Sequence, residues 1–390
     1  MRSDSRSERT FDLAVIGAGI VGLGVALAAA RAGRNVVVID RDSRANGASI
    51  RNFGFVTVTG QRAGAHWARA RRSRDIWAEI APRAGIEVLQ QGLVMPAYRP
   101  EAVEVVHAFL RTYMGAECRL INEAEAIRRL PFLRTEGVRE ILFSPHELRV
   151  ESREALPQLA RWLGSALGVE FRWNTAALGI EDRGVATSTG FISADATVVC
   201  PGDNFTVLFA DLIARHALKI CTLQMLRVAG EGVPPMLSPV MSDRSLARYE
   251  GFSALPESAP LQARLHLERR EMREFGIHLI AVQSADGSLV VGDSHVYGTS
   301  AEPFARSEIE EMILSAMDEV LVLPNRRVSE RWTGSYASSA TSTVLVERPA
   351  TNVRLVMVTG GTGASTGLAL GEQVVADLFS PSAVVSQALE

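Results

Sequence analysis

Lysine is almost missing from this sequence. Among its 390 residues Lys219 is the only lysine, and the other 40 of the 41 basic residues are arginine. An arginine-rich genome explains this bias most simply, but any role that needs an amine side chain then has one candidate. The 44 acidic residues bring the formal net charge to −3, so the basic excess of a non-specific nucleic-acid binder is absent.

Cysteines and targeting signals are scarce as well. The three cysteines, at positions 118, 200 and 221, have no metal-ligand spacing and form no even framework, so we predict no metal site and a reducing compartment. Residues 1–10 are polar and lack the apolar stretch of a secretion signal. We therefore expect a cytoplasmic protein without a nucleic-acid or membrane partner.

The uncharged run Leu13–Ala30 is long enough to suggest a membrane span, but its glycines indicate a nucleotide site. Residues 11–40 contain, in order, a buried strand at Phe11–Ile16, then Gly17, Gly19 and Gly22, an alanine-rich helix to Arg31, a strand at Val36–Ile39, and Asp40. The glycines allow a tight turn, close approach of the backbone to a pyrophosphate and close helix–strand packing, while the acid binds ribose hydroxyls. The helix N-terminus adds unpaired N–H groups and a positive dipole end. This pattern predicts a site for NAD or FAD.

The rest of the chain predicts an α/β fold with a second, α+β domain. Helices are expected at 61–81, 103–114, 123–130, 151–167 and 307–321. Alternating segments at 223–228, 277–283 and 289–292 indicate an antiparallel sheet, and the chain later returns to a buried strand at 353–358, a glycine-rich turn and a last helix to Phe379. We predict a discontinuous Rossmann-like nucleotide domain (1–80, 146–218 and 338–390) and a substrate domain (81–145 and 219–337). The return of the C-terminal segment to the nucleotide domain disfavours a simple NAD dehydrogenase.

This layout resembles the D-amino-acid oxidase/glycine oxidase/sarcosine oxidase superfamily of FAD-dependent oxidoreductases. Four stretches carry the resemblance, at residues 15–22, 47–49, 198–202 and 359–372. It implies FAD as the cofactor. The cofactor-binding residues it implies are Gly17, Gly19, Ile20, Val21, Gly22, Asp40, Arg41, Ala48, Ser49, Ala177, Pro201, Gly202, Gly361, Thr362, Gly363, Ala364, Ser365 and Thr366. Some members bind flavin covalently, but no cysteine lies near 331–336 and no histidine between 40 and 60, so we expect non-covalent FAD.

A narrower resemblance is to the FAD oxidoreductases encoded with phosphonate-catabolism genes. Short motifs at 51–54, 59–61, 223–227, 248–252, 292–295 and 363–366 carry it as a set. It implies oxidative deamination of 2-aminoethylphosphonate, or of its N-methyl or 1-hydroxy derivative, through an imine to an aldehyde such as phosphonoacetaldehyde plus ammonia or methylamine. The reduced flavin would be reoxidised by O2, giving H2O2, or by another electron acceptor.

The expected substrate is a small anionic amine, and a phosphonate favours arginine because its oxygens match the guanidinium fork. Arg51, with Asn52 beside it, is the first candidate, and Arg227, Arg248 and Arg331 are others. Tyr249 and His295 are the candidate catalytic residues, with His278 as a second possible base. Tyr249, His278, Trp332 and Tyr336 are expected to contact the substrate. A core role is an equal alternative for the aromatic residues, and a structural role is the alternative for His278 and His295.

Several alternatives stay open at this stage. A carboxylate also suits arginine, so the substrate could be sarcosine, glycine, proline or a D-amino acid, and a non-catalytic flavoprotein subunit is a further alternative. Sarcosine-oxidase-like relatives use a lysine near the flavin to reduce oxygen, whereas this sequence has Ala364-Ser365-Thr366 at that turn. Either another cation activates oxygen or the enzyme is a dehydrogenase. We expect a monomer or homodimer.

Overall fold

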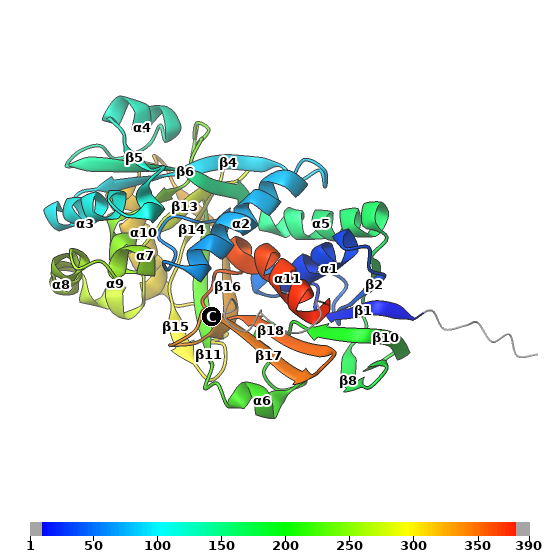
Figure 1. Cartoon of the computed structure of the whole chain (residues 1–390). Coiled ribbons are helices and arrows are strands. Elements are labelled where there is room, and N and C mark those ends of the chain that lie inside the picture. The colour runs from blue at the N-terminus through cyan, green and yellow to red at the C-terminus, as the bar shows by residue number, and fades with distance from the viewer. Residues whose placement is uncertain (1–9, 380–390) are drawn as a thin grey trace, which may run out of the picture.

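The computed structural model describes residues 10–379 and contains two large sheets joined through a layer of helices (Figure 1). The first sheet has eight strands. Its main path runs β17 (Val344–Ala350), β18 (Val353–Val358), β10 (Gly190–Val199), β1 (Phe11–Ile16), β2 (Val36–Ile39) and β7 (Glu170–Arg172), with β8 (Ala177–Glu181) and β9 (Gly184–Thr187) attached through β10. β1 pairs in parallel with β2 and β10, and β10 with β18, so strands distant in sequence meet in the centre. Their runs of β-branched residues are buried, as expected for parallel strands covered on both faces.

Helices α1 (Ile20–Arg31), α2 (Ala65–Ile80), α5 (Ser152–Leu167) and α11 (Gly363–Phe379) bury their apolar sides in the main core beside this sheet. The red helix α11 lies beside the blue helix α1 in Figure 1. Glycines allow this close crossing, since a Cβ on Gly371 would lie 2.2 Å from the carbonyl carbon of Gly24, and one on Gly24 would lie 2.6 Å from the oxygen of Gly367. The crossing places the start of α11 next to the start of α1.

The second sheet has ten strands. Its main path is β15 (Val296–Gly298), β11 (Lys219–Ala229), β14 (Leu289–Gly292), β13 (Ile280–Gln283), β12 (Val240–Met241), β4 (Val88–Ala97), β6 (Glu140–Val150) and β3 (Phe55–Val56), while β16 (Arg327–Ser338) also pairs with β11 and β5 (Arg119–Leu120) with β6. The pairs β11–β14, β11–β16 and β13–β14 are antiparallel. The remaining α-helices in the described range are α3 (Pro100–Leu110), α4 (Glu123–Arg129), α6 (Ala210–Ala214), α7 (Glu250–Ser253), α8 (Ser258–Glu268), α9 (Arg270–Glu274) and α10 (Ser307–Val320).

The predicted fold class is confirmed: a Rossmann-like parallel sheet is combined with a sheet of mostly antiparallel strands. Several bounds need correction. The helix expected from residue 61 begins at Ala65, because Gly64 adopts a positive φ of 85°. The helix expected at 103–114 begins at Pro100 and ends at Leu110, since proline suits a first turn. β6 crosses the predicted domain boundary at residue 146, and the division into domains stays a prediction.

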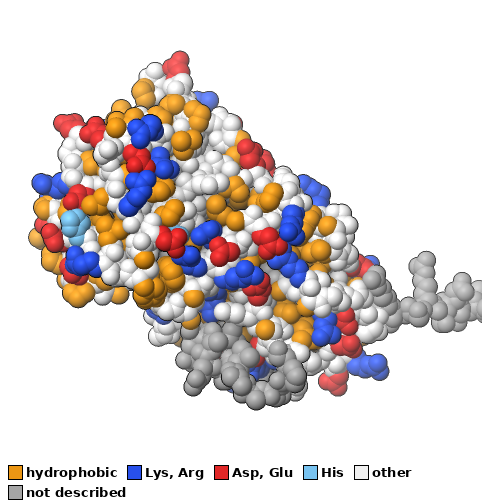
Figure 2. All heavy atoms as spheres, turned by 45° about the horizontal axis from the view of Figure 1, so that its top comes forward, with side chains coloured by type: hydrophobic (Ala, Val, Ile, Leu, Met, Phe, Trp, Pro, Cys, Tyr) orange, Lys and Arg blue, Asp and Glu red, His pale blue; other side chains and the backbone are white. Residues whose placement is uncertain are grey.

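The surface mixes charges of both signs. Figure 2 shows arginine side chains interleaved with acidic ones on one face of the molecule. Many of these pair, for example Arg72 with Glu372 at 2.7 Å and Arg31 with Glu79 at 2.9 Å. Between residues 10 and 379 no helix is both long and apolar enough to cross a membrane.

Candidate active site

The main cavity, of about 780 Å³, lies where the two sheets meet. The ends of β1, β2, β10 and β18 line one part of it, and residues of β11, β13 and β16 line the other. Carboxyl ends of parallel strands are the usual ligand-binding edge of an open α/β sheet. The cavity therefore joins a nucleotide-binding edge to a wall contributed by the second sheet.

The turn between β1 and α1 is shaped by glycines. Gly17 has a φ of 102°, and a Cβ on Gly22 would lie 1.8 Å from the oxygen of Gly17. The N–H of Ile20, at the start of α1, donates to Ser49 Oγ over 2.9 Å. Ser49 belongs to a short 3₁₀ turn, Ala48–Ile50, so this hydroxyl fixes the turn beside the helix N-terminus. Backbone and hydroxyl groups can thus approach an anionic ligand closely.

Asp40 follows β2 and lines the same end of the cavity. Its Oδ2 accepts the Ala18 N–H at 2.6 Å, and its Oδ1 accepts the Asp42 N–H at 2.9 Å. Burial raises the pKa of Asp40, and these two N–H donors oppose the shift. The carboxylate is therefore locked across the glycine turn, where an acid binds ribose hydroxyls in this fingerprint.

The C-terminal glycine turn closes the cavity from the opposite side. Gly361 has a φ of 72°, and a Cβ there would lie 2.8 Å from the Tyr336 ring. Thr362 lines the cavity, and its buried Oγ1 has no hydrogen-bond partner among residues 10–379. A buried hydroxyl without a partner calls for a polar ligand group. Ser365 Oγ accepts the Thr57 N–H at 2.8 Å, which ties the start of α11 to β3.

The glycine cradles, the locked carboxylate and the orphaned Thr362 hydroxyl fit a dinucleotide cofactor. The cofactor residues expected from the sequence that line the cavity are Gly17, Gly19, Ile20, Val21, Gly22, Asp40, Arg41, Ala48, Ser49, Ala177, Pro201, Gly202, Gly361, Thr362, Gly363, Ala364 and Ser365. Thr366 does not line it: its side chain is buried and donates to the Thr362 carbonyl at 2.9 Å.

The wall from the second sheet carries a compact group of polar side chains, which we call the histidine–aspartate cluster: His278, Asp293 and His295. His278 Nε2 lies 3.5 Å from Asp293 Oδ1, and His295 Nε2 lies 3.7 Å from Asp293 Oδ2. All three side chains are buried and line the cavity. Arg248, Tyr249, Tyr297 and Tyr336 line the cavity around them, and Arg248 Nη2 donates to Tyr297 Oη at 3.3 Å.

Burial sets the charges in this cluster. It raises the pKa of Asp293 to about 7, against the lowering effect of the Arg248 guanidinium. Burial, aided by the Arg248 charge, lowers the pKa of both His278 and His295 well below the usual value. Both imidazoles are therefore neutral at pH 7, and Asp293 titrates in the range where an acid or base works best.

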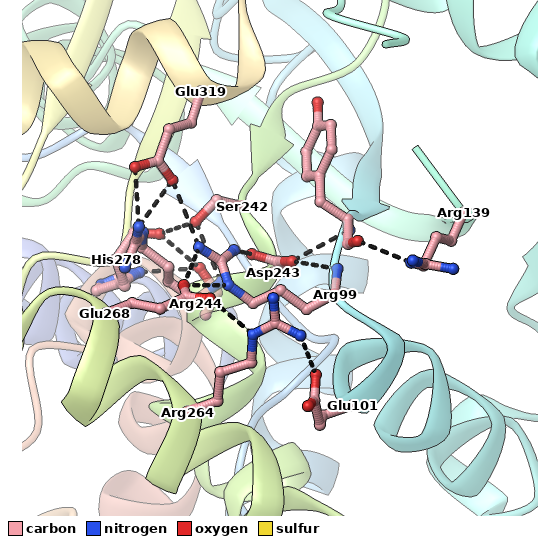
Figure 3. Close-up of polar contacts among 12 residues, drawn as sticks. Arg99, Glu101, Arg139, Ser242, Asp243, Arg244, Arg264, Glu268, His278 and Glu319 are labelled. Carbon is pink, nitrogen blue, oxygen red and sulfur yellow. Dashed lines mark hydrogen bonds and ion pairs between the residues drawn. The ribbon is translucent and has the colours of Figure 1, made fainter. Parts of the chain in front are cut away.

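A network of ion pairs supports His278 from behind (Figure 3). Arg99 Nη1 binds Asp243 Oδ1 at 2.7 Å, and Arg244 Nη2 binds Glu319 Oε2 at 2.7 Å. These pairs hold the 3₁₀ segment η3 (Asp243–Ala247). Ser245, within that segment, places its Oγ 3.0 Å from His278 Nδ1. The network thus fixes one imidazole of the cluster.

Not every candidate residue reaches the cavity. Arg51 and Asn52 line it, but both ends of the Asn52 amide bond local backbone, at Ala48 and Gly54. Arg227 lies about 13 Å along β11 from Leu223, which lines the cavity, and its guanidinium faces Glu151 and Glu330 instead. Those two acids lie outside the cavity.

Two further candidates lie elsewhere on β16. Arg331 is exposed and forms a fork with Glu310 at 2.6 and 2.7 Å. Trp332 does not line the cavity; its Nε1 donates to the Arg51 carbonyl at 3.1 Å, and Arg153 lies over its ring. Trp332 therefore supports the Arg51 backbone from outside.

Asp293 is not among the site residues expected from the sequence. It lies in the motif Gly292-Asp293-Ser294-His295, where the available signal is an acid two residues before a candidate histidine. The antiparallel pairing of β13 with β14 brings His278 next to Asp293, and this contact makes the acid part of the cluster.

The comparisons with known proteins agree with this geometry. The family description "DAO: FAD dependent oxidoreductase" matches residues 12–378. No protein with a curated description matches the sequence. Among solved structures, glycine oxidase from Bacillus cereus is 17% identical, with a TM-score of 0.73 and 95% and 97% of the two chains covered. Iminodiacetate oxidase from Chelativorans sp. is 18% identical, with a TM-score of 0.71 and coverage of 97% and 98%. The FAD-bound L-α-glycerophosphate oxidase from Mycoplasma pneumoniae is 15% identical, with a TM-score of 0.71 and 95% of each chain covered.

Proposed function

Because the chain belongs to the DAO family of FAD-dependent oxidoreductases, we propose that it oxidises a small amine carrying an anionic group, and that this amine is 2-aminoethylphosphonate. FAD is the cofactor. We propose that the seventeen cavity-lining residues of the nucleotide end hold it without a covalent bond, together with the Thr362 hydroxyl. Bound FAD supplies the acceptor for the hydrogen and two electrons that leave the substrate C–H bond.

One observation carries the choice of substrate. Beyond the nucleotide end, the cavity wall gathers Arg248 and Arg51 with Tyr249, Tyr297 and Tyr336. A phosphonate offers three acceptor oxygens and up to two negative charges, so it can use more of these donors than a carboxylate can. The neighbouring folds support both halves of the proposal, since their names include glycine and iminodiacetate as amines and glycerophosphate as a tetrahedral anion.

The protein's own residues do three things in this proposal. Arg248 and Arg51 hold the phosphonate, the wall of the second sheet positions the amine end, and closure by Tyr336 and the Gly361 turn excludes water from the reacting carbon. Loss of hydride gives an imine, which water converts into phosphonoacetaldehyde and ammonia. We propose O2 as the final electron acceptor, with an arginine of the cavity in place of the missing lysine.

The proposal is tested by product analysis in air. Purified enzyme with 2-aminoethylphosphonate should form aldehyde, ammonia and H2O2 in equal amounts. Glycine, sarcosine and proline serve as comparison substrates at the same concentration. Faster turnover of any of these amino acids would replace the phosphonate with a carboxylate substrate, and aldehyde without H2O2 would indicate a dehydrogenase.

A further inference from the structure

The histidine–aspartate cluster presents acceptor atoms without matching donors. His295 Nδ1 lies 3.1 Å from the Gly276 carbonyl, which can only accept, so the ring proton sits on Nδ1 and Nε2 bears a lone pair. That Nε2 faces Asp293 Oδ2 at 3.7 Å. The ring nitrogen that faces the Asp293 carboxyl group is therefore an acceptor and not a donor.

The surroundings of His278 allow the same tautomer, with the proton on Nδ1. The Ser245 hydroxyl lies 3.3 Å from the His278 carbonyl oxygen and 3.0 Å from its Nδ1. In the tautomer in which Ser245 Oγ accepts the Nδ1 proton, His278 Nε2 bears a lone pair toward Asp293. The ion-pair network of Figure 3 holds η3, and with it Ser245, in this position.

Asp293 completes the set. Its Oδ1 is buried and has no hydrogen-bond partner in the part of the chain that the structure describes. One ligand atom from each of the three side chains lies within 4.8 Å of the others. Three converging acceptors in a buried wall can together hold a cation or a multiple N–H donor between them.

We propose that the cluster is the receptor for the substrate's primary ammonium group, with its three N–H bonds directed at His278, Asp293 and His295, and that Asp293 removes the proton that frees the amine for oxidation. This inference rests on the proposed function and specifies its amine end. Arg248 supports this choice over a divalent metal. A Cβ on Gly276 would lie 3.0 Å from His295 Cβ and 3.4 Å from Arg248 Nη1, so the guanidinium stands beside the cluster. A zwitterion satisfies both, with its anion on Arg248 and its cation on Asp293.

The proton step balances without any further reactant. The N–H bond of the ammonium breaks and an O–H bond forms on Asp293, so an ammonium–carboxylate pair becomes a neutral amine and a carboxylic acid. The nitrogen lone pair released in this way is what the neighbouring C–H bond needs in order to lose hydride. His278 and His295 accept the two remaining N–H bonds and keep the nitrogen in place.

The first test uses the unmodified holoenzyme and measures flavin reduction without oxygen. Each N-methyl group removes one N–H bond from the ammonium. We expect the rate constant divided by the dissociation constant to fall about tenfold from 2-aminoethylphosphonate to its N-methyl derivative, and about tenfold again for N,N-dimethyl. Equal or faster reduction of the N-methyl compound would overturn the three-acceptor receptor. No reduction by any of the three would overturn the proposed function, and this inference with it.

The second test uses Asp293→Asn, with Asp182→Asn in the exposed β8–β9 turn as the matched control. Asparagine keeps the shape but cannot take the proton, so flavin reduction by 2-aminoethylphosphonate should slow at least about 100-fold. The inhibition constant of ethylphosphonate, which has no amine, should stay unchanged in both variants. FAD content and the shift of the flavin absorbance on binding ethylphosphonate confirm an intact cavity.

Three results would contradict the assignment. Normal reduction by Asp293→Asn would remove Asp293 from the proton step. Equal weakening of ethylphosphonate and of 2-aminoethylphosphonate would make it a general structural residue. One divalent metal per holoenzyme, lost in Asp293→Asn but retained in Asp182→Asn, would identify the cluster as a metal site.

Discussion

Burial decides the chemistry of the side chains around the substrate end of the cavity. His278 and His295 keep neutral imidazoles because a charged ring would lose its hydration beside the Arg248 guanidinium. Asp293, under the same burial, keeps a pKa of about 7. The carboxylate between the histidines is therefore the general base that we propose, and the histidine base expected from the sequence stays a prediction.

Arg248 should bind the anionic end of the substrate. We expect Arg248→Ala to raise the KM for 2-aminoethylphosphonate about 100-fold, because a charge-assisted bond to a phosphonate is lost, while a propylamine substrate changes little. Arg331→Ala is the matched control, since Arg331 is exposed and pairs with Glu310. Equal losses for the phosphonate and the neutral-tailed amine in steady-state assays would refute an anion-binding role.

Ionisation of the buried Asp293 carboxyl group should lower the stability of the folded protein. Its pKa is about 7 in the folded protein, against 3.8 for an ordinary aspartate, so folding takes up a proton between these two pH values. The stability linked to this proton is present below the lower pKa and is lost as the pH rises through 7. Asparagine does not titrate, so the Tm of Asp293→Asn relative to the parent should increase from about pH 5 to about pH 8. A constant Tm difference between the two proteins across this pH range would show that the pKa of the Asp293 carboxyl group is not raised.

The other charged groups facing Asp293 do not mask this titration. His278 and His295 stay neutral because their pKa values are lowered, and Arg248 keeps its charge throughout. Burial raises the pKa values of Tyr249 and Tyr336 well above the usual value of a tyrosine. Asp182→Asn, on the exposed turn, should show the same Tm difference from the parent protein at about pH 5 and at about pH 8.

At the scale of elements, the start of α11 is positioned by its crossing with α1. Ser365 ties it to β3, and Trp77 Nε1 donates to the Ala364 carbonyl at 3.0 Å. The glycine turn that precedes α11 lines the cavity. The distance between two helices therefore controls the shape of the cofactor site.

Gly371→Ala should weaken FAD binding from outside the cavity. A Cβ at this position would lie 2.2 Å from the Gly24 carbonyl carbon, so the two helices must move apart. We expect a loss of about 1–3 kcal/mol in unfolding free energy and a weaker FAD affinity. Gly179→Ala is the control, since no atom of the described residues lies within 4 Å of a Cβ on that β8 residue. Retention of parental Tm and FAD content by Gly371→Ala would show that the helix contact does not control the site.

The sequence predicts some elements far better than others. β1, β18 and α11 end within a residue of their predicted limits, because each is an apolar run next to a glycine-rich turn. β4 and β6 were missed. β6 buries Ser144, His146, Glu147 and Arg149 among its apolar residues, so the alternation that marks a strand is lost. Its polar groups have long-range partners, such as Glu147 Oε1 for the Thr59 N–H at 2.8 Å, which no local pattern reveals.

The same limit applies to the candidate site. Local motifs predicted the nucleotide end, where the glycines and Asp40 lie within one strand–helix–strand unit. The substrate end depends on pairings between distant strands, so Arg227, Arg331 and Trp332 could not be separated from Arg248 and Tyr336 in advance. The significance of Asp293 depends on the return of His278 across the β13–β14 hairpin.

On the scale of the whole molecule, one cavity connects the two sheets. The first sheet supplies backbone N–H groups and an acid at its strand ends, and the second supplies the arginine, the tyrosines and the histidine–aspartate cluster. The scarcity of lysine matters here, because Lys219 begins β11, is exposed and does not line the cavity. The cations on the cavity wall are arginines, which favour anions with several oxygens.

The most direct test of this assignment is anaerobic titration of the purified yellow holoenzyme, followed by its flavin absorbance. We expect 2-aminoethylphosphonate to bleach the flavin completely, and at least about tenfold faster than glycine or sarcosine at equal concentration, because only the phosphonate uses the full set of donors. Bleaching by glycine or sarcosine but not by 2-aminoethylphosphonate would contradict the assignment.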